Sequence, residues 1–113
     1  MGKTDRKITY DVEKKNGLSV VELNDLMQKW QTKLEMTDWK LSLKIGGFYR
    51  KDGYRQSGDF IADVNKKEAT IIMTNEPWRG DEEYTLVHEM IHVLFYDYDK
   101  YSEDLILKNF KEF

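Results

Sequence analysis

Changes in hydrophobic periodicity constrain the fold of this chain more than any other feature of its sequence. Between residues 18 and 35 the apolar side chains recur every three or four positions, as they do on one face of a helix. These positions are Val20, Leu23, Leu26, Met27, Trp30 and Leu34. From Trp39 to Ile45 apolar and polar residues alternate strictly, which is typical of a half-buried strand. A helical period returns over residues 84 to 96, so the sequence predicts an α+β domain.

The first helix has a clear start signal. Ser19 and Glu22 have the spacing of a capping box, in which each side chain accepts a hydrogen bond from the backbone of the other residue. Leu18 and Leu23 flank the box as a hydrophobic staple. We therefore expect a helix from Ser19 to about Glu35.

The middle of the chain predicts a small antiparallel sheet. Gly46-Gly47 is expected to end the first strand, and a polar loop with several aromatic residues follows from Phe48 to Gly58. Apolar residues alternate again over Phe60–Val64 and Ala69–Met73, on either side of the turn Asn65–Glu68. These two segments are expected to form a hairpin.

Length and composition indicate one domain over residues 1–113. A chain of 113 residues is long enough for one hydrophobic core and too short for two ordinary domains. Residues 1–17 are polar, and we expect a loosely held arm with a short extended piece at Ile8 to Val12.

Charge and cysteine usage exclude several classes of protein. The net charge is −3 with both signs interspersed, so no overall basic field would attract nucleic acid or an anionic membrane. The absence of cysteine rules out disulfides and thiolate metal sites. No apolar run is long enough for a membrane span, and Met1 to Lys7 has no signal-peptide core, so a cytoplasmic location is expected.

The segment His88-Glu89-Met90-Ile91-His92 is an HExxH motif that uses both histidines of the chain. On a helix, residues four apart lie on one side and roughly 6 Å apart along the axis, so both imidazoles can reach one ion. Neutral imidazole nitrogens bind Zn²⁺ at about 2.0–2.1 Å. We therefore expect His88 and His92 to be zinc ligands.

The sequence around the motif supports a helix. Asp81 is a candidate N-cap, and Glu82 and Glu83 would lie at the positive end of the helix dipole. A helical projection gathers the apolar side chains on one face, opposite His88 and His92. That apolar face consists of Leu86, Val87, Met90, Val93 and Leu94. One face can pack while the histidines face a cleft.

Glu89 is expected to carry the acid–base chemistry. Zinc lowers the pKa of a bound water and polarises the scissile carbonyl, while a neighbouring carboxylate takes the proton from the water and passes it to the leaving amine. The motif therefore predicts a zinc-dependent peptidase (hydrolase), with Zn²⁺ as cofactor, Glu89 as general base and acid, and a peptide or protein as substrate.

The elements around Thr85–His92 resemble a minimal zincin metallopeptidase. More narrowly, the chain resembles small metallopeptidases that phages and mobile elements encode, which are similar to compact gluzincins. The resemblance covers roughly residues 18 to 110, and HExxH is its specific motif. It implies that an edge strand pairs with the substrate peptide. Our candidate for that strand is Ala69–Thr74, with Ala69, Ile71 and Met73 as substrate-binding residues.

The third zinc ligand is less directly marked. In the extended motif HExxHxxGxxH, the glycine and the third ligand would fall at Phe95 and Tyr98, whose side chains do not fit. A gluzincin-like site takes a carboxylate from the next helix, which we expect to be short and to start near Ser102. The resemblance favours Glu103 as the ligand. Glu103 could instead have a purely structural role, as an acidic residue that the dipole of that helix stabilises. Other acidic candidates are Asp104 and Asp99, followed by Asp97 and Glu112.

An alternative function is a zincin-like module, catalytically weak or inactive, that binds a separate regulatory protein or nucleic acid. The segment Phe48–Arg55 combines aromatic and basic residues of the kinds that stack on bases and bind phosphates. Such a loop can equally be a solvated surface or line a substrate cleft.

Overall fold

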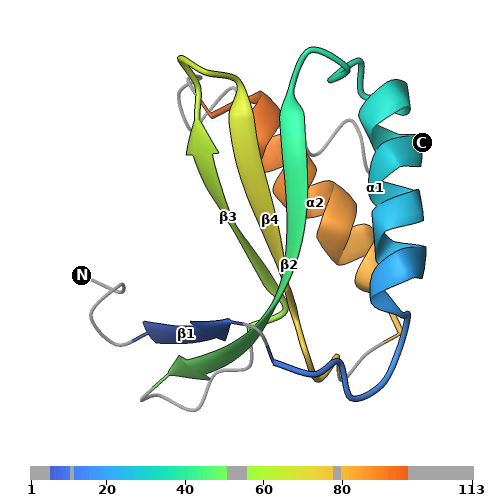
Figure 1. The fold of residues 1–113 in the computed structure, drawn as a ribbon, viewed down its shortest axis with the longest axis vertical. Helices are drawn as coiled ribbons and strands as arrows, with labels where there is room; N and C mark the ends of the chain where they lie inside the picture. Colours follow the sequence, from blue (N-terminus) through green and yellow to red (C-terminus); the bar gives the residue numbers. More distant parts are fainter. Residues whose placement is uncertain (1–5, 11, 51–55, 78–79, 97–113) are drawn as a thin grey trace.

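The computed structural model describes residues 6–10, 12–50, 56–77 and 80–96. Two helices and four strands follow one another in this part of the chain, as Figure 1 shows, and the predicted α+β class is confirmed. In chain order they are β1 (Arg6–Tyr10), α1 (Val20–Lys33), β2 (Lys40–Arg50), β3 (Gly58–Asp63), β4 (Glu68–Thr74) and α2 (Glu82–Leu94). Neither helix is long and apolar enough to cross a membrane.

The sheet is mixed, and its strand order is β1-β2-β4-β3. The predicted hairpin is confirmed, because β3 and β4 pair antiparallel with Phe60 opposite Ile71. However, β4 also pairs with β2, and that pairing is parallel. The chain reverses between β2 and β3 and again between β3 and β4, so β4 runs in the same direction as β2. The prediction of a wholly antiparallel sheet is therefore wrong.

Strand β2 continues through Gly46-Gly47, where we expected it to end. Its first part pairs with β4, and from Gly46 onward it pairs antiparallel with β1. A Cβ on Gly46 would lie 2.8 Å from Cγ2 of Ile72 and 3.0 Å from Cγ2 of Ile8, so only glycine fits at this change of partner. The short extended piece that we expected at Ile8 to Val12 is confirmed at Ile8 to Tyr10, which belong to β1. Because β1 pairs with β2, residues 6–10 are not the loosely held arm that we predicted.

Both helices pack on one face of the sheet (Figure 1). Alternating residues of β2 and β4 face them, so one core forms between the sheet and the helices. The largest fully buried side chains are Leu23, Met36, Ile71, Ile72, Met73, Leu86, Met90 and Val93. The predicted apolar stripe of α1 is confirmed at Leu23 and Met27, whereas Val20 is exposed. The predicted capping box is confirmed at Ser19 and Glu22.

A buried carboxylate ties the segment before α1 to the first turn of α2. Glu82 accepts a hydrogen bond of 2.7 Å from the backbone N–H of Leu18, and its other oxygen lies 2.7 Å from Nζ of Lys14. Gly17 has a φ of +74° beside this carboxylate. A burial of this kind is tolerated because the charge is both paired and hydrogen-bonded. We call Lys14, Gly17, Leu18 and Glu82 the N-terminal latch.

The same turn of α2 is also held from α1. Nε1 of Trp30 donates a hydrogen bond of 2.8 Å to Oε2 of Glu83. The start of the motif helix is thus attached to two other parts of the chain, which sets its position relative to the sheet.

Candidate active site

The two motif histidines come together on α2. Nε2 of His88 lies 2.9 Å from Nε2 of His92, and the ring centroids are 4.5 Å apart. Both side chains are half-buried, while Leu86, Met90 and Val93 on the opposite face of the helix are fully buried. The predicted division of α2 into an apolar face and a histidine face is confirmed.

The two nitrogens lie at hydrogen-bonding distance, and the same spacing fits a shared metal ion. Two nitrogens about 2.0–2.1 Å from one ion, with an angle of about 90–110° between them, lie roughly 3 Å apart. Within the described ranges no group of three His, Cys, Asp or Glu side chains could hold a metal. The predicted third ligands Glu103, Asp104 and Asp99 lie outside the described residues.

Aromatic rings from two elements pack around the histidines. The ring of Phe60 on β3 is stacked on His92, with centroids 5.8 Å apart and planes 5° apart. The ring of Tyr84, one helical turn before His88, lies 5.9 Å from the His88 ring. Tyr96 approaches Phe60 edge-on at 5.8 Å. These contacts restrict the imidazole orientations, as neighbouring groups of metal-binding histidines commonly do.

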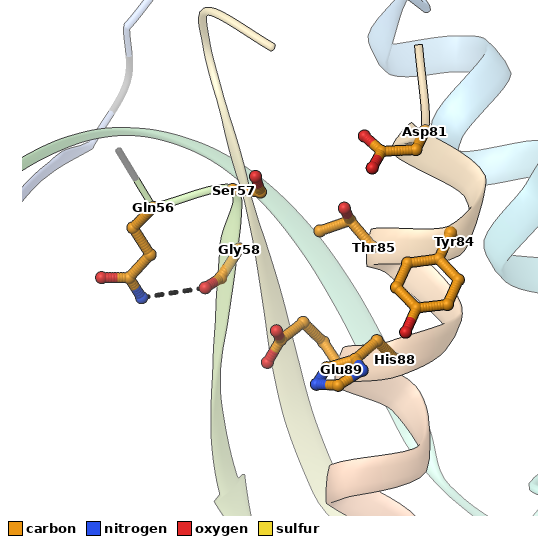
Figure 2. Close-up of a pocket in the computed structure, with 8 residues that line it drawn as sticks. All are labelled: Gln56, Ser57, Gly58, Asp81, Tyr84, Thr85, His88 and Glu89. Atoms are coloured by element: carbon orange, nitrogen blue, oxygen red, sulfur yellow. Dashed lines mark hydrogen bonds between the residues drawn. The ribbon is translucent and has the colours of Figure 1, made fainter. Parts of the chain in front are cut away.

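A cavity of about 260 Å³ opens beside His88, between the start of β3 and the first two turns of α2. Figure 2 shows its lining: Gln56, Ser57 and Gly58 on one side, and Asp81, Tyr84, Thr85, His88 and Glu89 on the other. The carboxylate of Glu89 points from α2 toward β3 (Figure 2). Glu89 and His88 therefore share one cavity.

Gly58 makes the close approach of β3 to α2 possible. A Cβ at this position would lie 2.9 Å from Cγ2 of Thr85 and 3.2 Å from Cγ of Glu89. Those distances are tighter than ordinary van der Waals contact, so a side chain here would push against the helix. The absence of a side chain at Gly58 thus lets the start of β3 lie against Thr85 and Glu89 of α2.

The prediction that Ala69–Thr74 is the edge strand is wrong, and the choice of Ala69, Ile71 and Met73 as substrate-binding residues depended on it. Strand β4 is interior, with β2 on one side and β3 on the other, and these three side chains are at most 5% exposed. The edge strand beside α2 is β3. The sequence marked both strands of the hairpin equally, and only the insertion of β4 next to β2 decides which one forms the edge.

No functional role was predicted for five of the lining residues, namely Gln56, Ser57, Gly58, Tyr84 and Thr85. The helical period could have found two of them, because Tyr84 and Thr85 precede His88 and Glu89 by one turn on the same side of α2. Asp81 occupies the predicted N-cap position, but its carboxylate makes no capping hydrogen bond. It lines the cavity instead.

The aromatic and basic segment Phe48–Arg55 divides in the structure. Phe48 to Arg50 belong to β2 and pair with β1, so they are not a loop. Residues 51–55 lie outside the described residues.

Comparison of the chain with models of protein families, with curated proteins and with solved structures finds no match. The interpretation of the site therefore depends on its own geometry.

Proposed function

We propose that the chain is a zinc-dependent peptidase of the minimal, gluzincin-like zincin type. One observation carries the proposal: Nε2 of His92 lies 2.9 Å from Nε2 of His88, and His88 lines a cavity together with Glu89. Two neutral imidazoles and a nearby carboxylate, on one turn of a well-packed helix, are the donor set and the base that metal-assisted hydrolysis requires.

The residues of α2 would divide the chemistry between them. His88 and His92 would hold Zn²⁺ together with a carboxylate from the C-terminal segment, for which Glu103 is the first candidate, before Asp104 and Asp99. When bound, zinc polarises the scissile carbonyl and makes water more acidic. Glu89 accepts the proton of the attacking water and delivers it to the leaving amine. Its position on the same helix as the ligands keeps the base at a constant distance from them.

The edge strand β3 supplies a docking surface for an extended peptide. Among the described strands β3 lies at the end of the strand order, so one of its sides pairs with none of them. Main-chain hydrogen bonds to such an edge are how many proteins bind peptides of varied sequence. Gly58 begins this strand next to Glu89, so a peptide paired with β3 would pass directly in front of the base.

Metal analysis of the purified full chain tests the metal site. The parent is expected to hold about one zinc ion per chain after incubation with Zn²⁺ and removal of the excess. His88→Ala should lose the metal, whereas Glu89→Gln should retain it, because Glu89 is not proposed as a ligand. A parent without stoichiometric metal would overturn the proposal. Glu103→Ala, compared with Asp104→Ala and Asp99→Ala, identifies the third ligand.

Cleavage of a peptide library tests the reaction. We expect the zinc-loaded parent to hydrolyse internal peptide bonds, and Glu89→Gln to lose at least about 100-fold in rate, the usual contribution of a general base. The alternative is a zincin-like module that binds a protein or nucleic acid. It would be supported if the parent cleaves no peptide and if such binding persists in Glu89→Gln and after removal of zinc by a chelator.

A further inference from the structure

We propose that the cavity beside His88 is a subsite for a basic side chain of the substrate, and that Asp81 selects it. This inference rests on the proposed peptidase function and adds a substrate preference to it. The cavity, of about 260 Å³, has room for a side chain and joins the position of Glu89 to the start of α2.

Asp81 faces the cavity and does not cap its helix. An aspartate at an N-cap ordinarily accepts a hydrogen bond from the backbone of the first turn. Ser19 does so at the start of α1, where its ψ is 165°, but Asp81 has a ψ of 35° and makes no such bond. Its carboxylate points from the helix toward the side of the cavity formed by Ser57 (Figure 2). The side chain is exposed, so a ligand can reach it.

The side chains that line the cavity are mainly hydrogen-bond acceptors. Besides two carboxylates, from Asp81 and Glu89, the described lining contains the hydroxyl groups of Ser57 and Thr85, which can accept hydrogen bonds. It contains no lysine or arginine. Tyr84 is 48% exposed, and its ring lines the cavity, where it can make a cation–π contact. Acceptors together with an aromatic ring favour a cationic group that carries several N–H donors, as guanidinium does.

The spacing of Asp81 and His88 along α2 fits an extended peptide. Asp81 and His88 are seven residues apart, which is two turns and about 10 Å along the axis, on nearly the same side of the helix. An extended peptide advances about 3.3 Å per residue, so Asp81 would meet a side chain two or three residues from the scissile bond. Asp81 is exposed, so solvent and salt would weaken the effect that a zinc ion bound at His88 has on its carboxylate.

Acetylated, amidated peptides with one arginine moved along an alanine-rich sequence test the preference. Each arginine peptide is compared with the same peptide carrying citrulline, which has nearly the same shape without the charge. At one position two or three residues from the cleaved bond, we expect roughly tenfold higher kcat/KM for arginine, the combined effect of an ion pair and a cation–π contact. Peptides with a free N-terminus and no arginine show whether an α-amine can take the place of the basic side chain. Equal cleavage of such peptides and of the arginine peptides would overturn the assignment of the cavity to a basic side chain.

Asp81→Asn isolates the carboxylate, because Asp81 makes no capping hydrogen bond that the substitution could remove, and helix α2 should be preserved. It should abolish the preference for arginine over citrulline. Asp25→Asn makes the same charge change on the exposed side of α1 and should leave the preference intact. Equal cleavage of both peptides by the parent, or an unchanged preference in Asp81→Asn, would overturn the inference.

A binding measurement separates failure of the subsite from failure of the proposed reaction. We would titrate the full chain with acetyl-arginine amide and follow the backbone amide signals of Asp81 and Thr85 by NMR, with acetyl-citrulline amide as the reference. Saturable shifts with the arginine compound alone, lost in Asp81→Asn, support the subsite even if no peptide is cleaved. Identical shifts with both compounds would refute it, whatever the cleavage assay shows.

Discussion

Gly17→Ala is a sharp test of the N-terminal latch, because the structure places three obstacles at one methyl group. Gly17 has a φ of +74°, and its Cβ would lie 2.2 Å from Oε1 of Glu82 and 2.8 Å from Cγ of Pro77. The left-handed conformation costs about 1–2 kcal/mol for a residue with a Cβ. Displacement of the Glu82 carboxylate from the Leu18 N–H would leave buried polar groups unsatisfied, at about 1–3 kcal/mol.

An effect on the unfolded chain partly offsets these two costs of Gly17→Ala. Alanine restricts the unfolded chain more than glycine does, which stabilises the protein by about 0.4–1 kcal/mol. We therefore expect Gly17→Ala to lower the free energy of unfolding by roughly 2–4 kcal/mol. Urea unfolding followed by tryptophan fluorescence would show this as a midpoint lower by roughly 1–3 M.

Gly80→Ala is the matched control. Apart from its chain neighbours, no described residue has an atom within 4 Å of the Cβ that alanine would add there, so its midpoint should stay close to that of the parent. In a Glu82→Ala background the cost of Gly17→Ala should fall, because the carboxylate that the methyl group meets is gone. A Gly17→Ala midpoint within about 0.2 M of the parent, or an equal loss in Gly80→Ala, would refute the reasoning.

Three further predictions concern the site, the capping box and the core. Gly58→Ala should push Glu89 away from β3 and lower kcat of the proposed peptidase while costing about 1–3 kcal/mol of stability; parental kcat would contradict this. The pKa of Glu22 is lowered, mainly by the backbone N–H of Ser19 and next by the hydroxyl group of Ser19. The ionised Glu22 carboxylate therefore stabilises the fold at a pH above the pKa that Glu22 has in the unfolded chain. This contribution is lost as the pH falls through the lower pKa of the folded protein. In an NMR titration, Ser19→Ala should raise the pKa of Glu22 toward its ordinary value, and an unchanged pKa would exclude the hydroxyl as a cause. Met90→Ala, at a fully buried position, should cost about 2–5 kcal/mol in urea unfolding, and a loss below about 1 kcal/mol would mean that the core repacks.

Local patterns along the chain were sufficient for the elements that pack through one face. The stripe of α1, its capping box and the division of α2 into two faces follow from residue spacing alone, because a helix brings residues three and four apart together whatever else the chain does. For the same reason the convergence of His88 and His92 was predictable. The hairpin of β3 and β4 was equally local, since its turn lies between two alternating segments.

What the sequence by itself determined was therefore the pair of histidines with Glu89 on one helix face, and the α+β class. Only the tertiary structure decided that β4 lies inside the sheet and that β3 borders the site, because strand order depends on contacts between residues far apart in sequence. The same holds for Gly58 and Asp81. A glycine that permits close approach, or an aspartate that faces a cavity instead of capping its helix, acquires that role only from the element packed against it.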